Sequence, residues 1–417
     1  MKPFLHHIAF FFLLLSVFAP LDGSAQEPEA VFVPDPWDVR LLRWVSGVAQ
    51  EGEIPLGPVS LEPDRMLGVS MRRGLYFGIG LKTNDRLSEW VSLNGFFGYW
   101  TRLKSFDYGV GVSLPLSPRN QIVLDIDYQR VSSALGEFGG MMEDGDHLLT
   151  RRNFKYTFFE NVYVRQQDFR VSLSGCFIPH FKVFLTYDYL HKFYTESFYL
   201  DPALPTVTDL RFSQMEVKLR YAYREQLVAW LSYMHNMPSA KHGMYEFDRV
   251  KFQLSQNFHT RRLGVSNVLL QSGIALRECP LAETFDMLGC YMPVGLYAPG
   301  CFNTMRFDEF FCDRFVAVFL SHNFGGMLWP TDSPWFHPEL TLATHIGWGD
   351  FPHARDYPDK NFRTMERGYF ESGFVIDGLL CLPLVRMGVG AFYRYGPYAF
   401  GNFKDDIALK WSLVFEI

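Results

Sequence analysis

Apolar and polar residues alternate with a period of two along most of this chain. The last eleven residues, IALKWSLVFEI (407–417), carry large apolar side chains at every odd position. Smaller or polar residues stand between them, including Lys410 and Glu416. The same alternation recurs in the segments 75–82, 121–129, 169–177, 181–189 and 215–223. This period, repeated over about ten residues at a time, is typical of β-strands with one apolar and one polar face.

Two features of the apolar faces favour a transmembrane barrel over a water-soluble β-sandwich. The faces carry almost no polar interruptions, as contact with lipid requires. Aromatic pairs stand near strand ends, where an interfacial girdle belongs: Tyr187 with Tyr189, Tyr221 with Tyr223, and Tyr393 with Tyr395. In lipid every backbone group must pair within the protein, so the strands must close on one another. We therefore predict an all-β fold, a transmembrane antiparallel β-barrel of about 16 strands, with 14 as the alternative.

Other parts of the chain show the alternation less regularly. Further strands are predicted at 90–101, 106–116, 226–235, 246–258, 264–276, 313–328, 338–349, 367–380, 384–398 and, least clearly, 283–297. Two longer connections, 133–152 and 350–366, are predicted to be extracellular loops, because barrels of this class have short turns on one side and longer loops on the other.

The N-terminus has the features of a secretory signal peptide. Lys2 precedes the apolar run 8–21, and Gly23 and Ala25 supply the small residues of a cleavage site. We predict a signal peptide at 1–25, with the cut after Ala25. Beyond it no run of about 18 apolar residues predicts a membrane-spanning helix. Export combined with alternating strands predicts a location in the outer membrane of a Gram-negative bacterium.

A periplasmic segment, 26–65, is expected between the signal peptide and the predicted barrel, 66–417. Asp35 and Pro36 suit the start of a helix and Gly47 suits its end, so we expect a short amphipathic helix there. The segment is too short for a plug domain, which disfavours a TonB-dependent transporter.

Composition narrows the functional classes. Charged residues make up 20%, aromatic residues 17%, and the formal net charge is −6, so no basic field indicates a nucleic-acid partner. Six cysteines are present: Cys176, Cys279, Cys290, Cys301, Cys312 and Cys381. Four of them are spaced eleven apart, which matches no zinc motif, so no metal is expected. Export makes disulfides chemically possible, and both a bridge and unpaired thiols remain open.

Several stretches of the sequence resemble a family of Bacteroidetes outer-membrane β-barrels of unassigned function. The similarity is carried by MLGVSMRRGLYFGIGLKTNDRLSEWVSLNGFFGYW, FLSHNFGGMLW, HPELTLATHIGWG, MERGYFESGFVIDGLL and GVGAFYRYGPYAFGNFKDDIALKWSLVF. It covers residues 40–417, and 394–406 is its most specific part. Members of that family usually carry a carboxypeptidase-regulatory-like β-sandwich before the barrel, for which this sequence has no room. The resemblance implies a location and an architecture, and it brings no reaction, ligand or cofactor.

The string FLSHN suggests a hydrolase, because some outer-membrane lipases use serine, histidine and a third polar group. Ser321 and His322 are neighbours in a predicted strand, however, so their side chains point to opposite faces. A catalytic triad needs them within hydrogen-bond reach. We therefore expect no enzymatic activity from this pair.

The string ERGYF, Glu366 to Phe370, resembles the Arg-Gly-aromatic motif in the inward-folded loop of the Omp85 transport and assembly barrels. Short motifs have a high rate of false matches. A solvated loop that leads into a strand is the favoured interpretation.

Charged residues on the polar faces of the last four predicted strands are candidates for the lumen wall. They are Glu339, His345, Glu371, Asp377, Arg386, Arg394, Lys410 and Glu416. Mixed signs on neighbouring strands favour a structural ion-pair network, and the alternative is a lining that selects solutes.

The leading functional hypothesis is passage or translocation of solutes or envelope components through an outer-membrane barrel. The alternative is a non-conducting structural or assembly partner in an outer-membrane complex. Expected partners are outer-membrane lipid, the barrel-assembly machinery and, under the alternative, another envelope protein. Trp411, Phe415 and Ile417 are the predicted assembly signal, since that machinery engages an aromatic-rich C-terminal strand.

Overall fold

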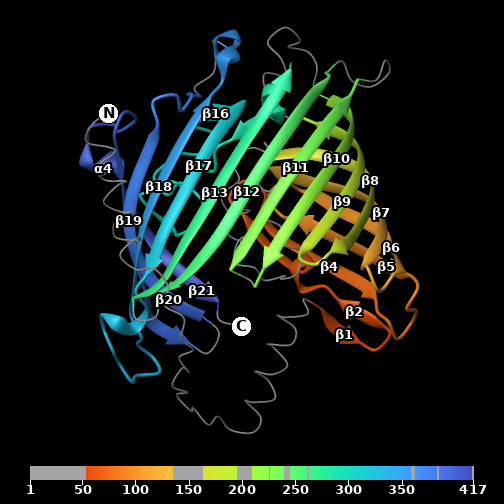
Figure 1. Ribbon diagram of the computed structural model, residues 1–417, viewed down its shortest axis with the longest axis horizontal. Coiled ribbons are helices and arrows are strands. Elements are labelled where there is room, and N and C mark those ends of the chain that lie inside the picture. Colours follow the sequence, from red (N-terminus) through yellow and green to blue (C-terminus); the bar gives the residue numbers. More distant parts are fainter. Residues whose placement is uncertain are drawn as a thin grey trace.

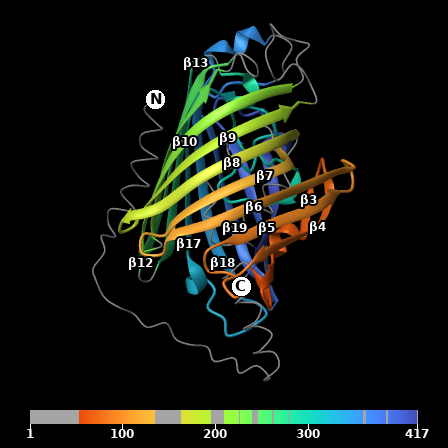
Figure 2. The ribbon, with the colours of Figure 1, turned by 90° about the vertical axis from the view of Figure 1, so that its right-hand side faces the viewer.

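The computed structural model describes residues 53–134, 163–194, 209–224, 226–238, 245–260, 263–277, 279–357, 362–382 and 385–415. These residues form one 19-stranded sheet and one two-stranded sheet, which confirms the all-β prediction. The large sheet curls round on itself, so that β19 to β9 cross the front of Figure 1 while β8 to β4 turn away behind them. Figure 2 shows the tilt of β8, β9 and β10 from the side. Within the described ranges, no helix has the length and apolar character needed to cross a membrane.

Fifteen strands follow one another around the sheet in antiparallel pairs. They are β4 (Gly74–Thr83), β5 (Ser92–Trp100), β6 (Ser105–Ser117), β7 (Ile122–Ala134), β8 (Tyr163–Ile178), β9 (Phe181–Phe193), β10 (Asp209–Tyr223), β11 (Leu227–Met237), β12 (Phe247–Thr260), β13 (Gly264–Arg277), β17 (Arg314–Asn323), β18 (Glu339–Asp350), β19 (Tyr369–Leu382), β20 (Val385–Tyr395) and β21 (Ile407–Phe415).

A sixteenth strand is broken into two pieces. β2 (Val59–Leu61) and β3 (Leu67–Ser70) pair with the two ends of β4, and the short turn η1 (Pro63–Arg65) separates them. With this broken strand the antiparallel wall of the described residues has 16 strands, although the sixteenth strand expected from the sequence was the one at 283–297. β1 (Ile54–Leu56) adds a short strand to β2, so the sheet includes residues before position 66, where the barrel was expected to begin.

The two faces of the sheet differ as the alternation predicts. In β21, Leu409 and Trp411 are 48% and 52% exposed, whereas Lys410 and Ser412 between them are buried. The outer face of β4 is likewise apolar and exposed at Leu75, Phe77, Ile79 and Leu81. An apolar outer band of this kind is the surface that contacts lipid in membrane barrels.

Connections differ in length at the two ends of the sheet. The turns after β6, β8, β10, β12 and β19 are short, while the connections after β7, β13, β18 and β20 are long. The connection 350–366 lies at the long-loop end and contains the turn η6 (Pro352–Asp356). Most of the predicted 133–152 loop falls outside the described residues, as do the predicted signal peptide and the predicted helix near residues 36–47.

Between β13 and β17 the chain leaves the wall, and we call residues 279–313 the lumenal segment. It contains η4 (Leu281–Glu283), β14 (Phe285–Asp286), β15 (Val294–Leu296) and β16 (Phe311–Cys312). β14 pairs with β16, while β15 pairs in parallel with β21 of the wall. Its apolar side chains pack against inward-facing residues, for example Phe285 against Phe315 with ring centroids 5.0 Å apart. The prediction of one continuous strand at 283–297 is therefore wrong, because the stretch forms two short strands, of which β14 pairs within the segment and β15 pairs with the wall.

Two further connections of the C-terminal strands, one at each end of the sheet, contain a short helical turn. η5 (Gly325–Met327) follows β17, and α4 (Phe403–Asp406) precedes β21. Asn402 caps α4 by accepting a hydrogen bond from the backbone of Lys404. The pairings in the described ranges run from β2 and β3 round to β21, and none of them joins those two edges directly.

Candidate functional site

Glu371, on the inner face of β19, holds the tip of the lumenal segment. The register of β18 and β19 places His345 directly opposite, and its Nδ1 lies 2.7 Å from Glu371 Oε1. The backbone N–H groups of Asn303 and Thr304 donate to the two carboxylate oxygens at 2.6 and 2.8 Å, and the Thr304 hydroxyl donates as well. All four residues are buried. Four groups thus contact the carboxylate, and three of them come from the segment.

Arg394, on β20, makes the second anchor. Although it stands opposite Glu371 in register, its guanidinium donates to both oxygens of Glu309 in the lumenal segment, at 3.1 and 2.8 Å. The guanidinium also lies 4.8 Å from the ring centre of Tyr369 and 4.5 Å from that of Phe400. Such a two-pronged pair fixes orientation as well as distance.

A third anchor joins the opposite side of the sheet to the same segment. Glu283 accepts hydrogen bonds from Lys192 of β9 at 2.8 and 3.0 Å and from the Tyr194 hydroxyl at 2.9 Å. Arg249 of β12 donates to its carboxylate at 3.3 Å and to its backbone carbonyl at 3.0 Å. Burial, together with the neighbouring Glu283, raises the pKa of Tyr194, which keeps its hydroxyl a donor.

Lys410 makes the fourth anchor, on the C-terminal strand. Its ammonium donates to the backbone carbonyl of Cys290 at 2.7 Å and lies 3.7 Å from the Cys290 sulfur. The backbone of β15 runs alongside, with the Tyr297 N–H donating to the Trp411 carbonyl at 2.8 Å. The edge of β21 that faces away from β20 is thereby covered by the chain's own segment.

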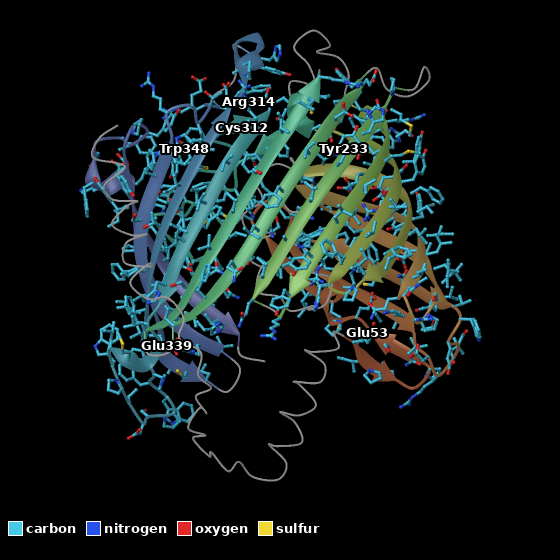
Figure 3. All side chains as sticks on the ribbon, viewed as in Figure 1. Glu53, Tyr233, Cys312, Arg314, Glu339 and Trp348 are labelled. Atoms are coloured by element: carbon cyan, nitrogen blue, oxygen red, sulfur yellow. The ribbon has the colours of Figure 1, made fainter. Side chains whose placement is uncertain are left out.

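The remaining predicted lumen residues lie toward the short-turn end. Figure 3 shows Glu339 at the opposite end of the sheet from Cys312 and Arg314. Glu339 accepts from Arg386 at 3.1 Å and from Asn323 at 3.0 Å, and it stands opposite Asp377 in register. These contacts form a small ion-pair cluster between neighbouring strands. Glu416 lies outside the described residues, as do Ile417 and the side chain of Phe415.

The sequence predicts the residues of these anchors that lie on the wall strands, but not those that lie in the lumenal segment. His345, Glu371, Arg394 and Lys410 were identified from strand parity, and Lys192 and Arg249 lie on the same kind of polar face. Glu283 and Glu309 were missed because the lumenal segment has no periodicity that assigns its side chains to a face. Their only sequence signal is that they are acidic residues in a stretch rich in buried aromatic and cysteine residues.

The suspected hydrolase residues do not assemble a triad in the described structure. His322 lies 2.7 Å from the Ser266 hydroxyl on the neighbouring strand, rather than beside Ser321. Its other ring nitrogen lies 2.8 Å from the backbone carbonyl of Leu263. Within the described residues, no carboxylate contacts His322. This geometry holds the imidazole between two strands without the third group of a triad.

The ERGYF string forms a turn and the start of β19. Arg367 is exposed, Gly368 has a φ of +83°, and Tyr369 is fully buried. The inward-folded part of the chain is instead the lumenal segment, more than fifty residues earlier.

Two other features complete the described structure. A cavity of about 340 Å³ lies at the long-loop ends of β5 to β8, where Lys104, Asp107, Arg130 and Arg165 line it. All six cysteines are free thiols in the structure, and the described ranges contain no cluster of three or more His, Cys, Asp or Glu side chains suited to a metal.

Neither a family model nor a curated protein matches the sequence. Solved structures do match it. BamA from Haemophilus ducreyi, crystallised without POTRA domains 1–3, is similar with a TM-score of 0.55 and 12% identity over 84% of this chain and 69% of that one. CdiB from Escherichia coli gives a TM-score of 0.51 and 12% identity over 86% of this chain and 62% of that one. The chain has the fold of an outer-membrane β-barrel. It spans less than two thirds of CdiB, and at 12% identity the likeness concerns the fold alone.

Proposed function

We propose that this protein is an outer-membrane β-barrel for the passage or translocation of solutes or envelope components, and that the lumenal segment keeps it closed at rest. The fold supports the first part, because its structural neighbours are outer-membrane barrels that include translocators. The anchoring of residues 279–313 supports the second. Buried ion pairs and hydrogen bonds join it to β9 and β12 on one side and to β19, β20 and β21 on the other.

The observation that carries the proposal is that one segment forms buried ion pairs with two sides of the sheet. A segment tied at Glu283 to one side and at Glu309 to the other occupies the space between them. Solutes can pass on that side of the lumen only when the segment moves. In this proposal the protein needs no cofactor and catalyses no reaction, and it works embedded in outer-membrane lipid after insertion by the barrel-assembly machinery.

A second function, a non-conducting structural or assembly partner of another envelope protein, is favoured by the completeness of the anchors. The Glu371 carboxylate has four polar groups within hydrogen-bond distance. The Glu283 carboxylate accepts hydrogen bonds from the side chains of Lys192, Tyr194 and Arg249. A segment so fully satisfied behaves as a permanent part of the core rather than as a gate.

Conductance measurements separate these two functions. The native-extracted protein would be compared in planar bilayers with a Glu283→Gln/Glu309→Gln double variant, which weakens the two anchors that use an acidic side chain of the segment and nearly preserves side-chain volume. Heat-modifiable gel mobility would verify that each barrel is folded. Closed wild-type barrels and steady nanosiemens-scale openings of the variant are expected for a gated passage. A folded double variant that stays silent would contradict it and support the non-conducting partner.

A further inference from the structure

A cavity opens in the wall where β6 and β7 separate, among the strands that face the viewer in Figure 2. At the long-loop end, the last residues paired between these two strands are Tyr108 and Arg130. Beyond that pair β6 stays paired with β5 as far as Ser105, and β7 stays paired with β8 as far as Ala134. The cavity of about 340 Å³ lies in the resulting split, because residues of both strands line it. Its volume is in the range of small-molecule sites, about 300–1,000 Å³.

Three cationic side chains line the cavity, from Lys104, Arg130 and Arg165. Lys104 and Arg165 are exposed, and Arg130 is partly exposed. Among the residues that the structure describes, no carboxylate forms an ion pair with any of the three. Positive charges gathered around one cavity repel one another, and a bound anion removes that repulsion. The lining is therefore complementary to a negatively charged group.

The carboxylate of the lining, Asp107, is already satisfied by its neighbours. It accepts hydrogen bonds from the Trp100 indole at 2.7 Å and from the Ser132 hydroxyl at 3.2 Å. The Arg73 guanidinium lies 4.0 Å from the centre of the Trp100 ring and donates to the Ser132 backbone carbonyl. These four buried residues join β5, β6 and β7 on the inner side of the split. Asp107 therefore leaves the three cations of the lining uncompensated.

The two arginines stand on the outer face of the wall. Arg130 is opposite Tyr108 in register, and Tyr108 is opposite Phe97, whose side chain is 53% exposed. Arg165 is opposite Ser132, two positions beyond Arg130 on the same strand. Paired residues share a face, as do residues two apart, so both arginines point to the side that carries the apolar band.

The outer face beside these cations suits a lipid better than a free anion. Phe97 and Phe106 line the cavity and stack with ring centroids 5.2 Å apart. Toward the middle of the wall, Val110, Ile126 and Phe169 are exposed on the same face. Cations and aromatic rings at the end of an apolar band lie at the level of the lipid headgroups. A lipid would use both the charged and the apolar surface, whereas a free phosphate would use only the charges.

We propose that this cavity binds a phosphate group of an outer-leaflet lipid, whose acyl chains lie along the apolar face of β5 to β8. Arginine forms two-pronged hydrogen bonds with phosphate, and basic pockets at a membrane surface bind phosphorylated headgroups. The long-loop end of an outer-membrane barrel is its extracellular end, which assigns the site to the outer leaflet. The inference rests on the outer-membrane location in the proposed function, and it does not depend on whether the barrel conducts.

Lipid binding to the full-length protein tests the proposal. The detergent-purified protein would be titrated with lipid A, a phosphorylated glycolipid, and the complexes counted by native mass spectrometry. We expect the Arg130→Gln/Arg165→Gln double variant to bind lipid A on the order of a hundredfold more weakly, because two charge-assisted hydrogen-bonding groups are lost. The Arg130→Lys/Arg165→Lys variant keeps the charge and should lose no more than about tenfold.

Arg119 provides the matched control. It is an exposed cation in the turn at the other end of β6 and β7. It lies a whole strand length from the cavity, well beyond the distance of about 8 Å over which salt screens exposed charges. Arg119→Gln should therefore bind lipid A as the wild type does. Heat-modifiable gel mobility would verify that every variant is folded.

Two further probes identify the source of the phosphate. Dephosphorylated lipid A should bind far more weakly than lipid A, and inorganic phosphate at the same concentration should not displace lipid A. Displacement by inorganic phosphate would overturn the lipid and leave a site for soluble anions. Equal lipid A binding by the wild type and the double glutamine variant would overturn the site itself and leave the proposed function untouched. Absence of the protein from isolated outer membranes would instead refute the location on which both depend.

Discussion

Neutralising Glu283 should release the lumenal segment from β9 and β12. Glu283→Gln keeps the shape of the side chain and removes the charge that pairs with Lys192 and Arg249. Glu283 is fully buried, and the side chains of its two partners are only 11% and 1% exposed. The variant therefore leaves two buried cations beside a neutral amide. Removing one partner of a buried ion pair is strongly destabilising, because the remaining charge is buried without compensation.

The expected magnitude follows from this burial. Removing one partner of a buried ion pair costs about 3–5 kcal/mol. If that loss falls on the packed state of the segment, the population of the released state rises on the order of a hundred- to a thousandfold, since 1.4 kcal/mol is about one factor of ten. β14 begins two residues after Glu283 and pairs Phe285 with Cys312, so release at Glu283 also opens the site around that thiol.

Cys312 provides a native reporter for this opening. Its side chain is fully buried in the wild type, so a soluble maleimide can label it only during excursions of the segment. The labelling rate of Cys312 would be followed in the folded barrel by peptide mass spectrometry. We expect the rate in Glu283→Gln to exceed the wild-type rate by about a hundredfold or more.

A partly exposed ion pair of the same type serves as the control. Glu53 lies 2.5 Å from the Lys82 ammonium at the edge of the sheet, with side chains 25% and 36% exposed, and Figure 3 shows it far from Cys312. Such pairs contribute about 0–1 kcal/mol, so Glu53→Gln should leave the Cys312 rate nearly unchanged. Equal rates in Glu283→Gln and the wild type would refute the idea that these charges hold the segment in place.

Three further predictions concern the wall and the segment. Val217→Arg puts a charge on the outer face and should lower the free energy of unfolding in lipid vesicles by about 2–4 kcal/mol. Lys218→Arg, on the inner face, should leave it nearly unchanged. Equal urea midpoints for the two variants would contradict the assigned faces. Gly98→Ala drives a methyl group into an aromatic ring and should lower the free energy of unfolding by about 1–3 kcal/mol, while Gly95→Ala should be close to neutral. Burial and a neighbouring aspartate raise the pKa of Asp286 well above 3.8, so its contribution to stability is present below that value and is lost as pH rises through the raised pKa. Asp286→Asn should therefore reduce the loss of stability as the pH rises above 3.8. The measurement is the urea midpoint at each pH, and an unchanged loss would contradict this assignment.

The sequence predicts the wall of this fold well, for a specific physical reason. A strand between lipid and an inner polar surface must place apolar and polar side chains on alternating faces. The sequences of β10 and β21 show this alternation at nearly every position. The bounds follow closely: the stretch predicted at 264–276 is β13 (Gly264–Arg277), and the one at 338–349 is β18 (Glu339–Asp350). The broken first strand and the short β1 beside it escaped detection, because these pieces are too short to show a period.

The inner assembly could be predicted only in part. Strand parity places Glu371 and Arg394 on the inner face. The register of the structure sets them opposite each other, yet Arg394 donates to Glu309. The lumenal segment is held by long-range contacts and has almost no regular structure of its own. Its side chains obey no period, so neither its path nor its charged partners can be read from local pattern.

The parallel pairing of β15 with β21 constrains the order in which this protein folds. The two strands lie on the order of a hundred residues apart in the chain, and contacts of such separation form late because a long loop must close first. β15 has no wall to lie on until the last strand is in place, and Lys410 arrives with that same strand. The interior of the barrel is therefore completed by β21. A chain shortened before residue 407 would form most of its wall, but its lumenal segment would lack the strand that β15 pairs with and the lysine that contacts Cys290.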